Sequence, residues 1–343
     1  MAQKKRQDAG FAKLKKDLSE NNLGNLYLFY GEEDYLRDYY IQQVQKKLLT
    51  EGMETFNLHQ FQGKELDIQT LADCVDALPM MSERTVILVY DYDLFENESR
   101  RDRLEQMFQD LPEYVCLIFI YDLLPYKSGG NTKLGKLLKK VATVVEFQPQ
   151  QQSDLNAWIR RHFKALGKEI DNSTAEYLTF VCGGLMTNLG GEIQKVGSYA
   201  AGSKITRADI DAVATPVLDA KVYELSKAVA ARNFGQAALV LGELYQMNEE
   251  PIMILAVLAG QLRQMWSARL ALESGKGQGY VADLWKLRSS WQAGNLMRSA
   301  RQFDLKWCRN AVALAAETDL AMKSTGIDRE ELLTDLLLKL AAG

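Results

Sequence analysis

The stretch LYLFYGEEDYLRDYY, from Leu26 to Tyr40, decides the fold. Its first five residues are apolar or aromatic and end at Gly31, as a buried strand does when it enters a tight turn. From Tyr35 onward the pattern becomes that of a helix. A strand, a glycine and a helix in this order also form the entrance to a phosphate-binding loop. In this chain, however, the glycine is followed by three acidic residues, Glu32 to Asp34.

The loop after this strand departs from the Walker pattern G-x-x-x-x-G-K-[ST], whose backbone N–H groups and lysine bind phosphates. When the pattern begins at Gly31, its second glycine falls on Leu36. Its lysine falls on Arg37 and its Ser/Thr on Asp38. Each carboxylate would repel a phosphate by about 1 kcal/mol at about 4 Å in water, and by more in a cleft. We therefore expect a degenerate, non-functional nucleotide loop whose acidic residues cap the next helix.

Up to residue 147 the chain alternates short β-rich runs with helical periods, which is typical of a doubly wound α/β domain. Two of the runs, VILVY and YVCLIFIY, are continuously apolar, as strands of a parallel sheet buried on both faces are. We expect strands at Leu26–Tyr30, Phe56–Phe61, Thr85–Tyr90, Val115–Tyr121 and Val141–Phe147. We expect helices between them at Tyr35–Leu49, Leu66–Ala77, Arg100–Gln109 and Thr132–Lys140.

The residues with catalytic or metal-binding chemistry form no recognisable site. Asp91 follows a predicted strand, where a Walker B aspartate would stand, but Tyr92 replaces the glutamate that would activate water. His59 and His162 are the only histidines and lie far apart in the sequence. The cysteines form no C-x-x-C pair of the kind that binds zinc: Cys74, Cys116, Cys182 and Cys308. We expect no catalytic residue, no metal site and no cofactor.

After the sequence QPQQQ at residues 148–152, helical periodicity replaces the strand pattern. Thr206 and Asp209 have the spacing of a capping box at the start of a short helix. From residue 216 onward, amphipathic helices follow one another with short turns. This organisation predicts three domains: an α/β domain at 1–147, a small helical domain at 148–215 and an all-α domain at 216–343.

Length and composition restrict the function further. The 343 residues exceed what one hydrophobic core usually supports. No apolar run approaches the roughly 20 residues of a membrane span, and the charged start does not fit a secretory signal. We therefore expect a cytoplasmic protein with no membrane partner. A formal net charge of −4 argues against binding nucleic acid through whole-molecule attraction.

Several motifs, taken in order, make the pattern specific. They are LYLFYGEEDYLRDYY, ALPMMSERTVILVYD, KLLKKVATVVEFQPQ, LNAWIRRHFKALGKEID, NLGGEIQKVGSYA with ITRADIDAV, and NEEPIMILAVLAGQLRQM. Over nearly its whole length the chain resembles the delta subunit of the bacterial DNA polymerase III clamp loader. The resemblance implies an AAA+-like α/β domain that does not hydrolyse ATP, a helical lid domain, and a helical collar that joins a five-subunit ring. The chain would then be part of the DNA polymerase III holoenzyme. By itself it would have no enzymatic activity.

The resemblance also implies partners and a binding site. A delta subunit binds the sliding clamp, the beta subunit, and holds one interface of this ring open. It works with the ATP-hydrolysing tau/gamma subunits and delta-prime, and reaches primed DNA through the complex. The clamp-binding positions of the family match Leu78, Met80 and Met81 in this sequence. Pro79 breaks the preceding helix, so at least one of the two methionines should face solvent or a partner. Without the resemblance, the same three residues also fit an ordinary core.

Trp291, in RSSWQAGN, resembles a collar aromatic that lies near the primer–template junction in some family members. It is a possible DNA-facing residue, and the alternative is a core position. Trp266, Trp285 and Trp307 fit only the core.

Two other functions stay open at this point. One is an active AAA+ or other P-loop ATPase, which the loop at Gly31 disfavours. The other is a helical scaffold or nucleic-acid-binding module with a vestigial P-loop domain. ATP turnover would favour the first, and failure to co-purify with a clamp and motor subunits would favour the second.

Overall fold

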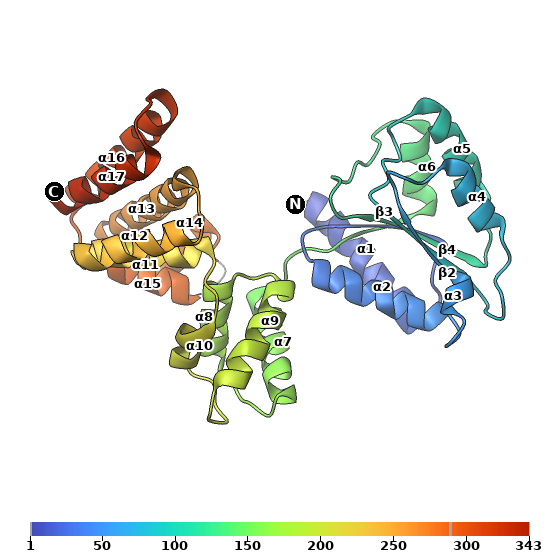
Figure 1. The fold of residues 1–343 in the computed structure, drawn as a ribbon, viewed down its shortest axis with the longest axis horizontal. Helices are drawn as coiled ribbons and strands as arrows, with labels where there is room; N and C mark the ends of the chain where they lie inside the picture. Colours follow the sequence, from blue (N-terminus) through green and yellow to red (C-terminus); the bar gives the residue numbers. More distant parts are fainter. Residues whose placement is uncertain (1, 288–289, 343) are drawn as a thin grey trace. The chain divides into compact units, whose positions relative to one another are not determined.

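The computed structural model describes residues 2–287 and 290–342. Its first part contains a parallel sheet of five strands in the order β2-β3-β4-β1-β5 (Figure 1). The strands are β1 (Leu26–Tyr30), β2 (Leu58–Gln62), β3 (Thr85–Tyr90), β4 (Val115–Tyr121) and β5 (Thr143–Glu146). The helices of this part are α1 (Ala2–Ser19), α2 (Asp34–Leu48), α3 (Glu54–Asn57), α4 (Ile68–Asp76), α5 (Glu98–Gln109) and α6 (Lys133–Val141).

Alternate residues of the central strands enter two separate cores. On β1, Leu26 and Leu28 belong to one core, whereas Tyr27 and Phe29 belong to the other. Helices α4, α5 and α6 cover the first face, and α1 and α2 cover the second (Figure 1). Because successive side chains of a strand point to opposite faces, a sheet covered on both sides requires apolar residues at every position. This requirement explains the continuously apolar runs in the sequence.

The three central strands have the predicted bounds, and the two edge strands differ. β2 begins at Leu58 instead of Phe56, because Phe56 and Asn57 belong to the short helix α3. β5 is shorter than predicted, because α6 continues to Val141 and β5 begins only at Thr143. The end strands of a sheet have a neighbour on one side only, so their sequences carry a weaker pattern.

Helix α1 is fixed to the edge strand β5. Gly10 lies so close to β5 that a Cβ atom at this position would come within 1.8 Å of the Val144 carbonyl oxygen. Lys13 Nζ donates to Thr143 Oγ1 at 2.9 Å and to Asp17 Oδ2 at 2.8 Å. The first helix is therefore an integral part of the α/β fold.

The chain divides into two compact units. The first contains the residues up to Pro149 together with Leu185–Thr187, and the second contains Gln150–Gly184 and the residues from Asn188 onward. The remaining helices are α7 (Gln152–Ala165), α8 (Asn172–Cys182), α9 (Met186–Tyr199), α10 (Arg207–Val213), α11 (Leu218–Ala230), α12 (Phe234–Gln246), α13 (Pro251–Glu273), α14 (Gln278–Trp285), α15 (Ser290–Ala300), α16 (Leu305–Ser324) and α17 (Arg329–Ala342).

The second unit has the helical character that the sequence predicts. The capping box of Thr206 and Asp209 is confirmed at the start of α10. The large core from α11 onward is built by side chains of successive amphipathic helices. The predicted parallel α/β domain followed by helical regions is confirmed. The further division of the second unit at residue 215 stays a prediction. Within the described residues, no helix combines the length and the apolar character that a membrane span requires.

Candidate functional site

The loop after β1 is closed by contacts within the protein. Gly31 has φ +129°, and a Cβ atom there would lie 2.3 Å from the Phe147 carbonyl oxygen. Only glycine fits such a conformation and such a close approach without distortion. Two residues later, the backbone N–H of Glu33 donates to the same Phe147 oxygen at 3.0 Å. A Walker loop would direct N–H groups of this kind at phosphate oxygens.

Glu33 is a completely buried carboxylate in this loop. It stands at the N-cap position of α2, but its side chain makes no capping hydrogen bond there, so the predicted capping role is wrong for this residue. Instead, its Oε1 accepts the backbone N–H of Met186 at 3.1 Å. Met186 begins α9 and belongs to the first unit. Loss of hydrating water raises the pKa of Glu33 to about 7, against the lowering effect of the Met186 hydrogen bond.

Arg37, at the Walker lysine position, is buried among carboxylates. Its Nη1 lies 2.9 Å from Asp34 Oδ1 and its Nη2 lies 2.9 Å from Asp122 Oδ1. Its Nε lies 3.6 Å from Asp38 Oδ1, the residue at the Walker Ser/Thr position. Leu36, at the second glycine position, packs against the core under α2. The one cation of this loop is thus surrounded by the protein's own anions, which would compete with any phosphate.

Asp91 organises the next loop along the same edge of the sheet. Its Oδ1 accepts the backbone N–H groups of Asp122 at 3.0 Å, Leu123 at 2.8 Å and Leu124 at 2.9 Å. The neighbouring Tyr92, at the Walker B glutamate position, is buried in the core. The structure therefore brings Asp91 and Arg37 together through Asp122, in a network that connects the loops after β1, β3 and β4.

The three predicted clamp-binding residues lie at the opposite edge of the sheet, in the loop between α4 and β3. Leu78 is 79 % exposed, Met80 is 53 % exposed and Met81 is 78 % exposed. Helix α4 ends at Asp76, so Leu78 lies beyond the helix. The apolar residues of the helix itself, Ile68, Leu71 and Val75, are buried. The alternative that Leu78 and both methionines are core residues is wrong.

Asn57 is a residue of this edge that sequence reasoning missed. It is completely buried, and its Oδ1 accepts the Met80 N–H at 2.7 Å while its Nδ2 donates to the Met80 carbonyl oxygen at 2.8 Å. Its Nδ2 also donates to the Met53 oxygen at 3.0 Å and to Ser82 Oγ at 3.1 Å. The preceding Phe56 is 54 % exposed. From the sequence, an asparagine before a strand is interpreted as a turn residue. Its neighbours in the sequence do not indicate that it binds Met80, 23 residues away.

The tryptophans from residue 216 onward were predicted to be core residues, with a DNA-facing role as the alternative for Trp291. Trp291 belongs to α15, but its side chain lies outside the described residues, so its DNA-facing role stays a prediction. Trp307 is buried, and Trp266 and Trp285 pack partly buried against the same core, as expected.

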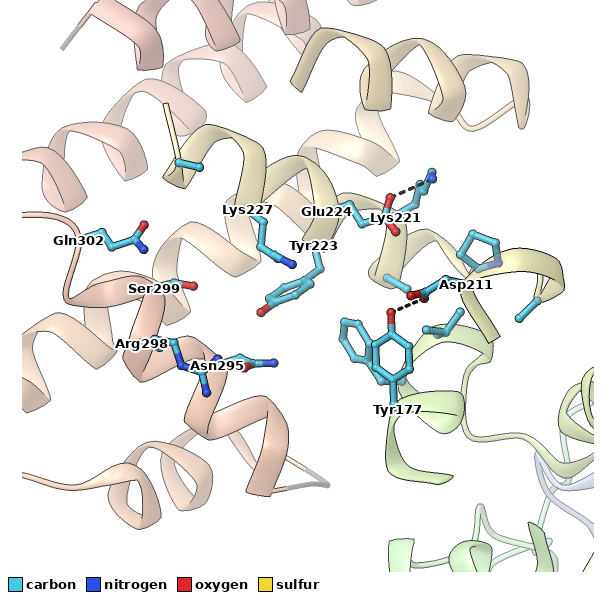
Figure 2. Close-up of a pocket in the computed structure, with 16 residues that line it drawn as sticks. Tyr177, Asp211, Lys221, Tyr223, Glu224, Lys227, Asn295, Arg298, Ser299 and Gln302 are labelled. Atoms are coloured by element: carbon cyan, nitrogen blue, oxygen red, sulfur yellow. Dashed lines mark hydrogen bonds and ion pairs between the residues drawn. The ribbon is translucent and has the colours of Figure 1, made fainter. Parts of the chain in front are cut away.

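The second unit also contains a cavity of about 420 Å³ between α8, α10, α11 and α15 (Figure 2). The Tyr177 hydroxyl donates to Asp211 Oδ1 at 2.5 Å across one side of it. Lys221 Nζ lies 2.9 Å from Glu224 Oε2 and 2.7 Å from Glu243 Oε2. Asp211, Lys221 and Glu224 thus have partners within the protein, and we assign no ligand to this cavity.

Comparison with known proteins gives a consistent result. The family model for the DNA polymerase III delta subunit matches residues 27–148, and the model for the C-terminal domain of this subunit matches residues 219–340. The DNA polymerase III subunit delta of Bacillus subtilis (strain 168) is 27 % identical over 334 residues, which cover 95 % of each chain. A probable DNA polymerase III subunit delta of Aquifex aeolicus is 20 % identical over 260 residues, covering 73 % of this chain and 72 % of the relative.

A solved structure agrees in fold with the whole chain. The Bacillus subtilis DNA clamp loader delta protein superposes with a TM-score of 0.51 at 24 % identity, and the match covers 96 % of this chain and 99 % of that protein. The two family models together include both the α/β region and most of the helical region. The chain belongs to the DNA polymerase III delta subunit family.

Proposed function

We propose that this protein binds a sliding clamp and holds its ring open while the clamp is loaded onto primed DNA. The observation that carries the proposal is the exposed apolar loop of Leu78, Met80 and Met81 at the amino-terminal edge of the sheet. Exposed apolar side chains that gather on one loop favour a protein partner. Membership in the delta subunit family supports a clamp as this partner.

The exposed area is large enough to support binding. Complete burial of one such side chain contributes about 1.5–3 kcal/mol. The exposed fractions of the three residues add up to the equivalent of about two fully exposed residues. Their burial would therefore contribute roughly 3–6 kcal/mol before the association cost is subtracted. Methionine suits this position, because its flexible thioether adapts to an irregular apolar pocket.

The proposal is tested with the double variant Met80→Ala plus Met81→Ala. We expect it to lose stable binding to the sliding clamp of the same organism, while its circular dichroism and assembly with the other loader subunits stay unchanged. Gel filtration of the variant mixed with the clamp measures the complex. A matched control is Met247→Ala plus Met253→Ala, which removes two exposed methionines from the second unit. An undiminished complex of the first variant with the clamp would exclude this loop as the binding site.

We also propose that the chain does not hydrolyse ATP. The guanidinium of Arg37 is paired with Asp34 and Asp122, the N–H of Glu33 is bonded to Phe147, and Asp91 accepts three backbone N–H groups. These three groups, which stand where an active site would contact nucleotide or magnesium, therefore have partners within the protein. We expect no phosphate release above background when the purified chain is incubated with ATP and magnesium. Measurable turnover that survives further purification would contradict the proposal.

In the complete loader, the partners would be the ATP-hydrolysing tau/gamma subunits and delta-prime, with primed DNA reached through the complex in the cytoplasm. Affinity purification of the chain from its own cells tests this arrangement. Recovery of the clamp together with the motor subunits supports it, whereas recovery of neither favours a free-standing scaffold.

A further inference from the structure

We propose that Asn57 is a positioning residue of the clamp-binding loop. Its buried carboxamide fixes the backbone of Met80, so that the exposed side chains of Leu78, Met80 and Met81 have one arrangement before the clamp arrives. This inference rests on the proposed clamp binding and adds the residue that prepares the loop for it.

The hydrogen bonds of Asn57 join three segments of the chain. A primary amide has one carbonyl acceptor and two N–H donors. The acceptor binds the Met80 N–H, and the donors are directed at the carbonyl oxygens of Met80 and Met53 and at the Ser82 hydroxyl. Ser82 Oγ also accepts the Thr50 N–H at 3.3 Å. Both polar backbone groups of Met80 are thus bonded to one side chain that is completely buried.

The backbone next to this contact has an uncommon conformation. Met81 has φ +53°, in the left-handed region that few residues other than glycine adopt. Such a conformation persists only where the surrounding structure holds it. The two hydrogen bonds at Met80 provide that restraint, one residue before Met81. Without them, the loop would be free to relax, and its exposed side chains would lose their fixed arrangement.

A loop that must be ordered during binding gives a lower affinity than one that is already ordered. We therefore expect Asn57→Ala to weaken clamp binding at least tenfold, although Asn57 is buried and has no solvent exposure with which to touch the clamp. A merely structural role would lower the thermal stability and leave the affinity of the folded protein unchanged.

The experiment measures the dissociation constant for the purified sliding clamp of the same organism, at a temperature where each variant is folded by circular dichroism. Asn25→Ala is the matched control. The Asn25 side chain donates to the Pro112 carbonyl oxygen at 2.7 Å before β1, and no hydrogen bond joins it to the loop at residues 77–82 within the described residues. We expect this control to lower stability and to keep the wild-type affinity.

Two further measurements separate positioning from stability. Hydrogen exchange at the Met80 amide should become at least tenfold faster in Asn57→Ala, while the amides within β3 keep their protection. In the background of Met80→Ala plus Met81→Ala, Asn57→Ala should reduce the residual affinity by a smaller factor than in the wild type, because two of the three side chains that it positions are absent. If Asn57→Ala does not fold, Ser82→Ala is the milder variant, and we expect it to weaken binding about two- to fivefold by removing one partner of the carboxamide.

The outcomes are distinguishable. Wild-type affinity in folded Asn57→Ala, or in Ser82→Ala where that variant must be used, overturns the positioning role. Additive effects of Asn57→Ala and the methionine variant also overturn it. If the wild-type protein does not bind the clamp at all, the proposed function fails, and the exchange of the Met80 amide still shows whether Asn57 fixes the loop.

Discussion

Glu33 illustrates how a single side chain can change the chemistry of an inherited loop. Sequence alone indicates an acidic residue where a phosphate would bind, but not which donor the carboxylate contacts. In the structure it accepts the N–H of Met186, 153 residues later, at the beginning of a helix that favours negative charge. A contact so distant in sequence leaves no periodic pattern, which is why the predicted capping role was wrong.

The raised pKa of Glu33 predicts a pH dependence of stability. A carboxyl group whose pKa rises from 4.5 in the unfolded chain to about 7 in the folded protein stabilises the fold most below pH 4.5. This contribution is lost as the pH rises through 7. Glu33→Gln removes the titration, so at pH 8 we expect the variant to be more stable than the wild type by about 1–3 kcal/mol. Urea denaturation between pH 4.5 and 8 measures the difference, and identical pH profiles for the two proteins would contradict it.

At the level of the element, the strength of a sequence pattern follows from burial. β1, β3 and β4 are covered on both faces, so their runs are continuously apolar and their bounds could be predicted. β2 exposes part of its side chains, and the four-residue helix α3 before it is too short to produce a helical period. Pro79 predicted that at least one of the two methionines would be exposed, and both are, together with Leu78. The hydrogen bonds of Asn57 to this loop, in contrast, depend on the fold.

Asp91 shows how an acidic residue after a strand can stabilise a neighbouring loop. We expect Asp91→Ala to destabilise the protein by about 1–3 kcal/mol, because three backbone N–H groups lose their acceptor. Asp91→Asn should retain most of the stability, since an amide oxygen also accepts hydrogen bonds and asparagine tolerates the observed φ of +52°. Urea denaturation compares both with Asp73→Ala, a control at an exposed residue of α4. Equal losses in the alanine and asparagine variants would show that charge, and not the acceptor oxygen, is required.

In the whole molecule, the two edges of one sheet have different properties. At the carboxyl edge, Arg37, Asp91 and Asp122 are joined in one internal network. At the amino edge, apolar side chains remain exposed. Because both edges belong to a unit with its own two cores, clamp binding should require little from the helical unit.

This organisation leads to a prediction for a fragment of residues 1–149. It retains both cores of the α/β fold and the complete loop at residues 77–82, so we expect it to fold and to bind the clamp within about threefold of the full chain. It lacks Met186, so the backbone N–H that Glu33 accepts in the full chain is absent. Circular dichroism and a clamp-binding titration test both points. A folded fragment that does not bind would mean that the helical unit contributes directly to binding.

The contact between Gly10 and Val144 has a practical consequence for the handling of this protein. Deletion of the first nineteen residues would expose the outer side of β5. Its unpaired backbone N–H and C=O groups could then form hydrogen bonds with the same strand of another molecule. Shortened preparations should then form oligomers or precipitate for reasons unrelated to replication. Affinity tags and fluorescent labels are accordingly better attached at the far end of the polypeptide.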